Sequence, residues 1–131
     1  MSEGLQSDAY PMEEDGEQPV PVRWRAPLAS IAERFAAGDF LLAKPVPSVR
    51  PMRANIAKQA REYVADYGCT LVLLPEETWE TSVCIFSGEG RWDVLVDLWT
   101  AEEGRSDLVL LVYVHARGDD FEIEVRLLYV P

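Results

Sequence analysis

The sequence predicts an α+β domain in which two N-terminal helices pack on one face of an antiparallel sheet of about five strands, arranged as a meander. Two observations predict this class. Apolar residues recur at helical spacing within residues 27–67 and alternate with polar residues within residues 91–131. Short polar loops join the alternating segments, and parallel neighbours would need a long crossover, so the strands are expected to be antiparallel.

Residues 1–22 contain six acidic side chains and no basic one, together with Pro, Gly and Ser, and show no apolar period. Such a segment buries too little apolar surface to offset the entropy cost of ordering it. We therefore predict a disordered acidic tail over residues 1–22 and a single α+β domain over residues 23–131. Trp24, just inside this domain, either packs against the first helix or binds a partner.

The first helix is expected over residues 27–37, where apolar residues recur at helical spacing and Gly38 provides the stop. Two prolines exclude a helix from the connection that follows. The second helix is expected over residues 51–67, and Gly68 closes it as a left-handed residue.

Five strands are expected after the helices, each with an apolar run or an apolar alternation. Their predicted ranges are 70–74, 79–86, 91–100, 108–114 and 121–129. Matching the apolar faces predicts the register, because a slip of one residue would turn every side chain to the other face. The predicted pairs between the third and fourth strands are Arg91–His115, Leu95–Leu111 and Asp97–Val109. Those between the fourth and fifth are Val109–Arg126, Leu111–Glu124 and His115–Asp120.

The second face of this sheet is mixed, with apolar residues at its centre and charged or aromatic residues around them. Its polar and aromatic members are Asp93, Asp97, Trp99, Tyr113, His115, Glu122, Glu124 and Arg126. An aspartate inside a strand is disfavoured unless another group compensates it. The predicted register places Arg126 two strands away from Asp97, so the two form either a structural ion pair or the floor of a ligand or catalytic groove. Trp79 and Trp99 are expected at the rim as interface anchors.

Glu102, Glu103 and Asp107 surround the turn at Gly104. The alternating spacing of a calcium loop is absent, so we expect a structural turn in which Arg105 reaches a neighbouring carboxylate, and no metal. His115 is the only histidine, which leaves no two-histidine metal site, and the sequence indicates no cofactor. The two cysteines are either reduced or joined in a disulfide, Cys69 to Cys84.

The formal net charge of −11 is unevenly distributed along the chain. Residues 23–67 carry eight basic and four acidic side chains, and residues 68–131 carry four basic and thirteen acidic ones. An acidic sheet disfavours nucleic acid as a partner and favours a basic protein. No apolar run approaches the length of a membrane span and no signal-peptide pattern is present, so a cytoplasmic protein is expected. Monomer and homodimer both remain open.

The chain also resembles an uncharacterised family of small bacterial proteins. The resemblance covers roughly residues 27–131 and is carried by the run W-D-V-L-V-D-L-W-T at 92–100, the turn E-E-G-R-S-D-L-V-L at 102–110 and the terminal Y-V-P. It supplies no catalytic motif. In size and charge the chain is similar to immunity proteins, and helices followed by a curved antiparallel sheet are similar to the cone-shaped nuclear-transport-factor-like fold.

These observations predict a non-enzymatic acidic binding protein, most concretely an immunity protein that covers a basic surface of a bacterial toxin. The alternative is a small-molecule-binding or enzymatic cone with a pocket on the second face. The residues expected to bind are Trp79, Asp93, Asp97, Trp99, Glu102, Glu103, Arg105, Asp107, Tyr113, Glu122, Glu124 and Arg126.

Overall fold

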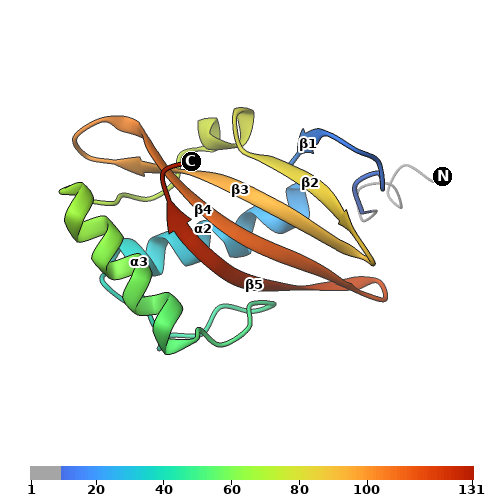
Figure 1. Ribbon diagram of the computed structural model, residues 1–131, viewed down its shortest axis with the longest axis horizontal. Coiled ribbons are helices and arrows are strands. Elements are labelled where there is room, and N and C mark those ends of the chain that lie inside the picture. The colour runs from blue at the N-terminus through green and yellow to red at the C-terminus, as the bar shows by residue number, and fades with distance from the viewer. Residues whose placement is uncertain (1–9) are drawn as a thin grey trace.

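The computed structural model describes residues 10–131. Its elements in chain order are β1 (Glu17–Pro19), α2 (Val22–Ala36), α3 (Ala54–Tyr67), the 3-10 helix η1 (Glu76–Glu80), β2 (Val83–Gly88), β3 (Arg91–Thr100), β4 (Gly104–Arg117) and β5 (Asp120–Tyr129). The strands form one antiparallel sheet in the order β1-β2-β3-β4-β5. Helix α2 lies behind this sheet and α3 lies beside β5 (Figure 1). The predicted α+β class is confirmed.

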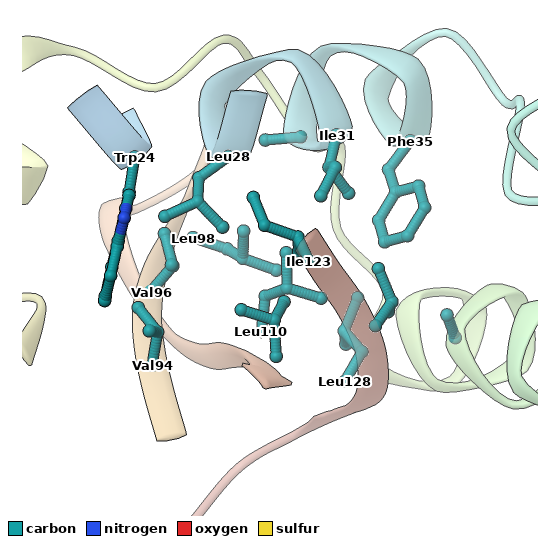
Figure 2. Close-up of a cluster of buried hydrophobic side chains, with 14 of the residues drawn as sticks. Trp24, Leu28, Ile31, Phe35, Val94, Val96, Leu98, Leu110, Ile123 and Leu128 are labelled. Carbon is teal, nitrogen blue, oxygen red and sulfur yellow. The ribbon is translucent and has the colours of Figure 1, made fainter. Parts of the chain in front are cut away.

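The hydrophobic core lies between α2 and the inner face of the sheet (Figure 2). On α2, Trp24, Leu28 and Ile31 are fully buried at the four- and three-residue spacing of one helix face. Strand β3 alternates buried and half-buried residues along its whole length, so its even-numbered side chains enter the core. Trp24 belongs to α2 itself and packs in the core as part of that helix, whereas the prediction had it pack against the helix from outside.

The N-terminal boundary differs from the prediction. Within the predicted disordered tail of residues 1–22, Glu17–Pro19 form β1 against β2, Val20 is fully buried, and α2 already begins at Val22. Tyr10 stacks on Trp92 with ring centroids 5.4 Å apart. A few apolar contacts thus order an acidic segment whose composition alone indicates disorder; residues 1–9 lie outside the described residues.

Three predicted strands also differ. The strand expected over residues 108–114 is β4, which starts at Gly104 and ends at Arg117. Within residues 70–74 only Leu71 forms an isolated bridge, to Thr100 of β3. Trp79 lies in η1, and the following strand starts at Val83. The chain turns into a 3-10 helix after Pro75 because the backbone N–H of Thr78 donates to the Pro75 carbonyl. The fifth strand of the sheet is therefore β1, which the apolar pattern did not indicate.

The predicted register between β3 and β4 is confirmed at Arg91–His115, Leu95–Leu111 and Asp97–Val109. The predicted register between β4 and β5 is wrong. The observed pairs are His115–Glu122, Leu111–Leu127 and Val109–Tyr129.

The physical reason for this error is the turn between β4 and β5. Arg117 pairs with Asp120, so the turn contains only two residues, and Gly118 has a φ of 63°. Two-residue turns with positive φ match the twist of antiparallel strands, whereas the prediction assumed a longer loop. A bulge between Leu111 and Val112 then leaves Arg126 as an extra residue on β5.

The backbone of β5 forms hydrogen bonds with other segments at two places along its outer edge. Backbone groups of Ser48 and Arg50 bond to Ile123, and the side chain of Gln59 on α3 bonds to Leu128. The edge backbone of β5 is therefore already hydrogen-bonded at Ile123 and Leu128.

Both cysteines are free thiols, and burial raises the pKa of Cys84 to about 11. Within residues 10–131, neither helix has the length and apolarity needed to cross a bilayer.

Candidate binding surface

The outer face of the sheet is the face turned away from α2. Its centre is apolar and half-buried, because Leu95 of β3 pairs with Leu111 of β4 and Leu111 pairs with Leu127 of β5. Figure 1 shows that no helix lies over this face. Its side chains are therefore open to a partner.

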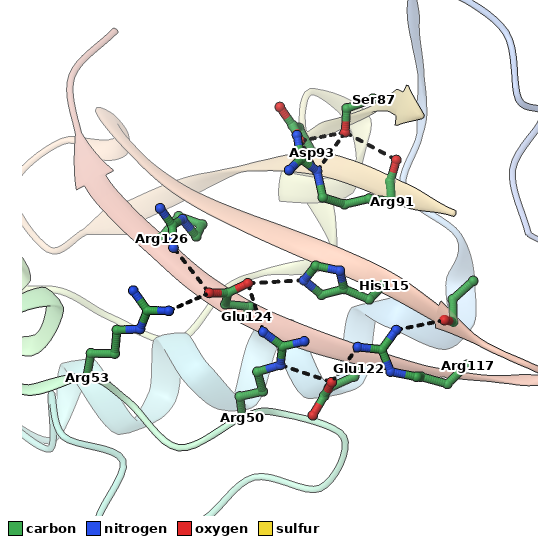
Figure 3. A network of polar contacts seen from close by, with 11 residues as sticks. Arg50, Arg53, Ser87, Arg91, Asp93, His115, Arg117, Glu122, Glu124 and Arg126 are labelled. Carbon is green, nitrogen blue, oxygen red and sulfur yellow. Dashed lines mark hydrogen bonds and ion pairs between the residues drawn. The ribbon is translucent and has the colours of Figure 1, made fainter. Parts of the chain in front are cut away.

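An arginine cluster occupies the half of the outer face along β5 (Figure 3). We use this name for Arg50, Arg53, Arg117 and Arg126, whose guanidinium groups surround the carboxylates of Glu122 and Glu124. Arg50 bridges the two carboxylates, with Nε 2.9 Å from Glu122 and Nη1 3.1 Å from Glu124.

Glu124 is the most enclosed member, with a side chain only 13% exposed. Burial alone would raise the pKa of Glu124, but hydrogen bonds from His115 and Arg126 and the charge of Arg50 outweigh it, so that pKa lies below its ordinary value. The pKa of Glu122 is also lowered, chiefly by its hydrogen bond from Arg50. Both groups are therefore held as carboxylates at neutral pH.

Tyr113 and Asp93 lie next to this cluster. The guanidinium of Arg91 lies 3.9 Å from the centroid of the Tyr113 ring, and that of Arg126 lies 5.0 Å from it. Asp93 accepts a hydrogen bond from Ser87 at 2.9 Å and lies 3.5 Å from Arg91. The predicted binding residues Asp93, Tyr113, Glu122, Glu124 and Arg126 thus do come together on one face, in contact with arginines.

Asp97 is not paired with Arg126, contrary to the predicted ion pair. Its carboxylate accepts a hydrogen bond from Thr81. Its backbone N–H donates to Ser82 at 2.9 Å, and its carbonyl accepts from Thr78 at 2.7 Å. The segment around η1 therefore compensates the aspartate within the strand, and Arg126 bonds to Glu124 instead.

An acidic depression lies at the end of the outer face nearest the β3–β4 turn. Its volume is about 470 Å³, and its lining residues are Asp97, Arg105, Ser106, Asp107, Val109, Val130 and Pro131. Among the described residues, Asp97 and Asp107 have no ion-pair partner within 4.0 Å. The depression therefore brings together three of the predicted binding residues and offers two carboxylates to a cation.

Two predicted carboxylates, Glu102 and Glu103, connect the β3–β4 turn to the end of α3 and the residues that follow it. Glu102 accepts the backbone N–H of Thr70 at 2.9 Å, a bond that lowers its pKa. Tyr67 donates to Glu103 at 2.6 Å, which raises the pKa of the tyrosine. The predicted contact of Arg105 with these glutamates is not found among the described residues, where Arg105 is exposed.

The two predicted aromatic anchors differ from each other. Trp79 is only 7% exposed and packs in the core, with Arg25 5.7 Å from its ring centroid. Trp99 is half-buried on the outer face, and a Cβ added to Gly104 would lie 3.6 Å from its ring. Only Trp99 is placed to contact a partner.

Arg50, Arg53 and Arg117 are the members of this surface that sequence reasoning missed. Arg50 and Glu124 are 74 residues apart in the chain, so no local pattern joins them. The excess of basic residues in 23–67 could have indicated that arginines contact the acidic sheet. These residues were instead expected to lie on a basic helical half, separate from the sheet. Within residues 10–131, no group of three His, Cys, Asp or Glu side chains converges on a metal position.

Residues 32–131 match the model of a family described as Domain of unknown function (DUF7668). No curated protein matches the chain, and no solved structure does. The match bears out the expected membership in a family without an assigned activity.

Proposed function

Because the chain belongs to the DUF7668 family, whose description assigns no activity, we propose from its surface that it is a non-enzymatic protein-binding module that binds a basic partner. In its most specific form, the proposal is an immunity protein of the bacterial cytoplasm that neutralises a toxin.

The observation that carries this proposal is the acidic depression, in which Asp97 and Asp107 have no ion-pair partner among the described residues, on a sheet face that no helix covers. A lysine or arginine side chain of a partner would bind Asp97 and Asp107 in this depression, because charge-assisted hydrogen bonds to carboxylates are among the strongest polar contacts. Val109, Val130 and Pro131 supply apolar surface for the aliphatic part of such a side chain.

The surroundings of the depression support the same partner. Glu76, Glu77 and Glu80 belong to η1, which packs against β3, and are exposed. Acidic surfaces of this kind steer basic partners, and steered association reaches about 10⁸–10⁹ M⁻¹s⁻¹ at low salt, against about 10⁵–10⁶ M⁻¹s⁻¹ without steering.

Among the described residues, those of the alternative, a pocketed cone, lie in two different places on the outer face. Tyr113 and Arg126 contact each other, whereas Asp97 lines the separate acidic depression. This geometry favours a binding surface over a catalytic pocket.

The experiment uses the purified chain and a toxin encoded beside its gene. We expect Asp107→Lys to slow association at least tenfold and to abolish protection of cells from that toxin. Glu33→Lys, an equal charge change at an exposed position of α2, is the control and should leave protection intact. The proposal is wrong if the association rate does not change with salt concentration. It is also wrong if Asp107→Lys and Glu33→Lys affect association and protection equally.

A further inference from the structure

The arginine cluster carries more positive charge than its own carboxylates neutralise. Four guanidinium groups face two glutamates, which leaves a formal excess of two positive charges in a chain of net charge −11. This excess lies on the same outer face as the acidic depression, but on its opposite half.

The guanidinium groups also keep unused hydrogen-bond donors. Arg53 is 66% exposed, and its Nη2 lies 3.7 Å from Glu124, beyond hydrogen-bonding distance. Arg117 is 50% exposed and uses one contact to Glu122 and one to the Ala116 carbonyl. Each arginine has five N–H donors, so both ends of the cluster present free donors to an incoming anion.

The cluster is arranged as a row along β5. Arg117 pairs with Glu122, Arg53 and Arg126 pair with Glu124, and Arg50 joins the two carboxylates. Glu122 and Glu124 are two residues apart on one strand, a separation of about 6.6–6.8 Å. An extended peptide places alternate side chains on one side at the same spacing, so acidic residues at every second position would match the row.

The surroundings favour a peptide over two other occupants. A strand cannot be added to β5 at the positions where Ser48, Arg50 and Gln59 already bond to its edge. A nucleic acid would carry its continuous phosphate charge past Glu122 and Glu124 on a chain of net charge −11. Discrete carboxylates can instead avoid the two glutamates and accept hydrogen bonds from the free N–H groups of Arg53 and Arg117 at the two ends of the cluster.

We propose that the arginine cluster is a second docking site, specific for an extended acidic segment of a protein partner with carboxylates at alternate positions. It is separate from the acidic depression and does not depend on the proposed function. A partner that engages both sites presents a basic side chain and an acidic segment, and this pairing fixes its orientation along the strands.

The test uses the full chain labelled with ¹⁵N and a synthetic peptide in which glutamate alternates with serine. We expect amide shifts at residues 122–126 and binding that weakens as salt is raised. Arg53→Gln and Arg117→Gln should each weaken binding about two- to fivefold, as expected for exposed ion pairs. Arg53 makes no hydrogen bond in the cluster, so its replacement leaves the fold intact, and circular dichroism verifies this.

Arg61→Gln is the matched control, because Arg61 is an exposed arginine on α3 outside the cluster. It should bind the peptide as the unmodified chain does, and so should Asp107→Lys, which disables only the acidic depression. The proposal is wrong if neither cluster variant changes the affinity, or if the shifts map elsewhere. Equal binding of a peptide with contiguous glutamates, of inorganic phosphate or of a single-stranded oligonucleotide would also overturn it.

Discussion

The side-chain amide of Gln59 on α3 makes the two hydrogen bonds that a neighbouring strand would make to Leu128 on β5. Its Nε2 donates to the Leu128 carbonyl at 2.7 Å, and the Leu128 N–H donates to its Oε1 at 3.2 Å. A helix thereby satisfies the backbone of an edge strand through one side chain.

Replacement of Gln59 by Leu should destabilise the domain by about 1–3 kcal/mol, because it leaves a donor and an acceptor of Leu128 without partners. Urea denaturation measures this change in the free energy of unfolding. Arg61→Ala, at an exposed position of the same helix, should change it by less than about 0.5 kcal/mol. An equally small effect of the Gln59 variant would show that water replaces the amide at no cost.

Glu124 should make stability depend on pH. Its pKa is lowered in the folded state, so its contribution is fully present above the ordinary glutamate value, about 4.3, and is lost as pH falls through the folded-state pKa. The difference in unfolding free energy between the unmodified chain and Glu124→Gln should therefore become smaller as the pH falls below about 4.3. Urea titrations at several pH values test this, and a difference that stays constant down to pH 3 would contradict it.

Double-mutant cycles measure whether Asp97 interacts with Thr81, its observed partner, or with Arg126, the partner that the predicted register suggested. Asp97→Asn and Thr81→Val should show an interaction energy of about 0.5–3 kcal/mol, because the two side chains are hydrogen-bonded. Asp97→Asn and Arg126→Met should be additive within about 0.5 kcal/mol, because Arg126 bonds to Glu124. Coupling in the second cycle together with additivity in the first would reverse this assignment.

Removal of residues 1–21 should lower the free energy of unfolding by more than about 2 kcal/mol. The truncation deletes β1, the fully buried Val20 and the stack of Tyr10 on Trp92. Val20→Ala alone should cost about 1–3 kcal/mol, whereas Met12→Ala, at a position 65% exposed, should cost less than about 0.5 kcal/mol. A truncated chain as stable as the full one would restore the prediction that the fold starts after residue 22.

The sequence predicted the parts of the fold that depend on local alternation. In β3 the period of two identified both faces and the register with β4 from Arg91 to Asp97, because the apolar stripe fixes each side chain. A bulge between Asp97 and Trp99 changes the register toward the turn. It did not reveal β1, whose three residues are too few to show a period. The two-residue turn at Gly118 and the bulge at Arg126 displaced the predicted partners on β5 by two residues near the turn and by three residues beyond the bulge. The face pattern could not reveal the first displacement, because a shift of two residues leaves that pattern unchanged.

The predicted members of the candidate surface lie on the outer face, but their contacts were not predictable. Asp97 and Glu124 were both expected on the outer face, yet their actual partners come from segments that the sheet pattern does not describe. Thr81 follows a 3-10 helix, and Arg50 lies in the connection before α3. Contacts between such distant segments depend on tertiary packing, which no local period encodes.

The position of β1 in the chain has a consequence for folding kinetics. Strands β2 to β5 follow one another through short connections, whereas Pro19 of β1 and Cys84 of β2 are 65 residues apart. Closing that long loop costs conformational entropy, and the stabilising contacts of β1 form only once the loop is closed. We therefore expect β1 to pair with β2 after the rate-limiting step of folding. Substitutions in β1 would then speed unfolding and leave the folding rate almost unchanged. The first strand would thus determine how long the native state persists rather than how quickly it forms.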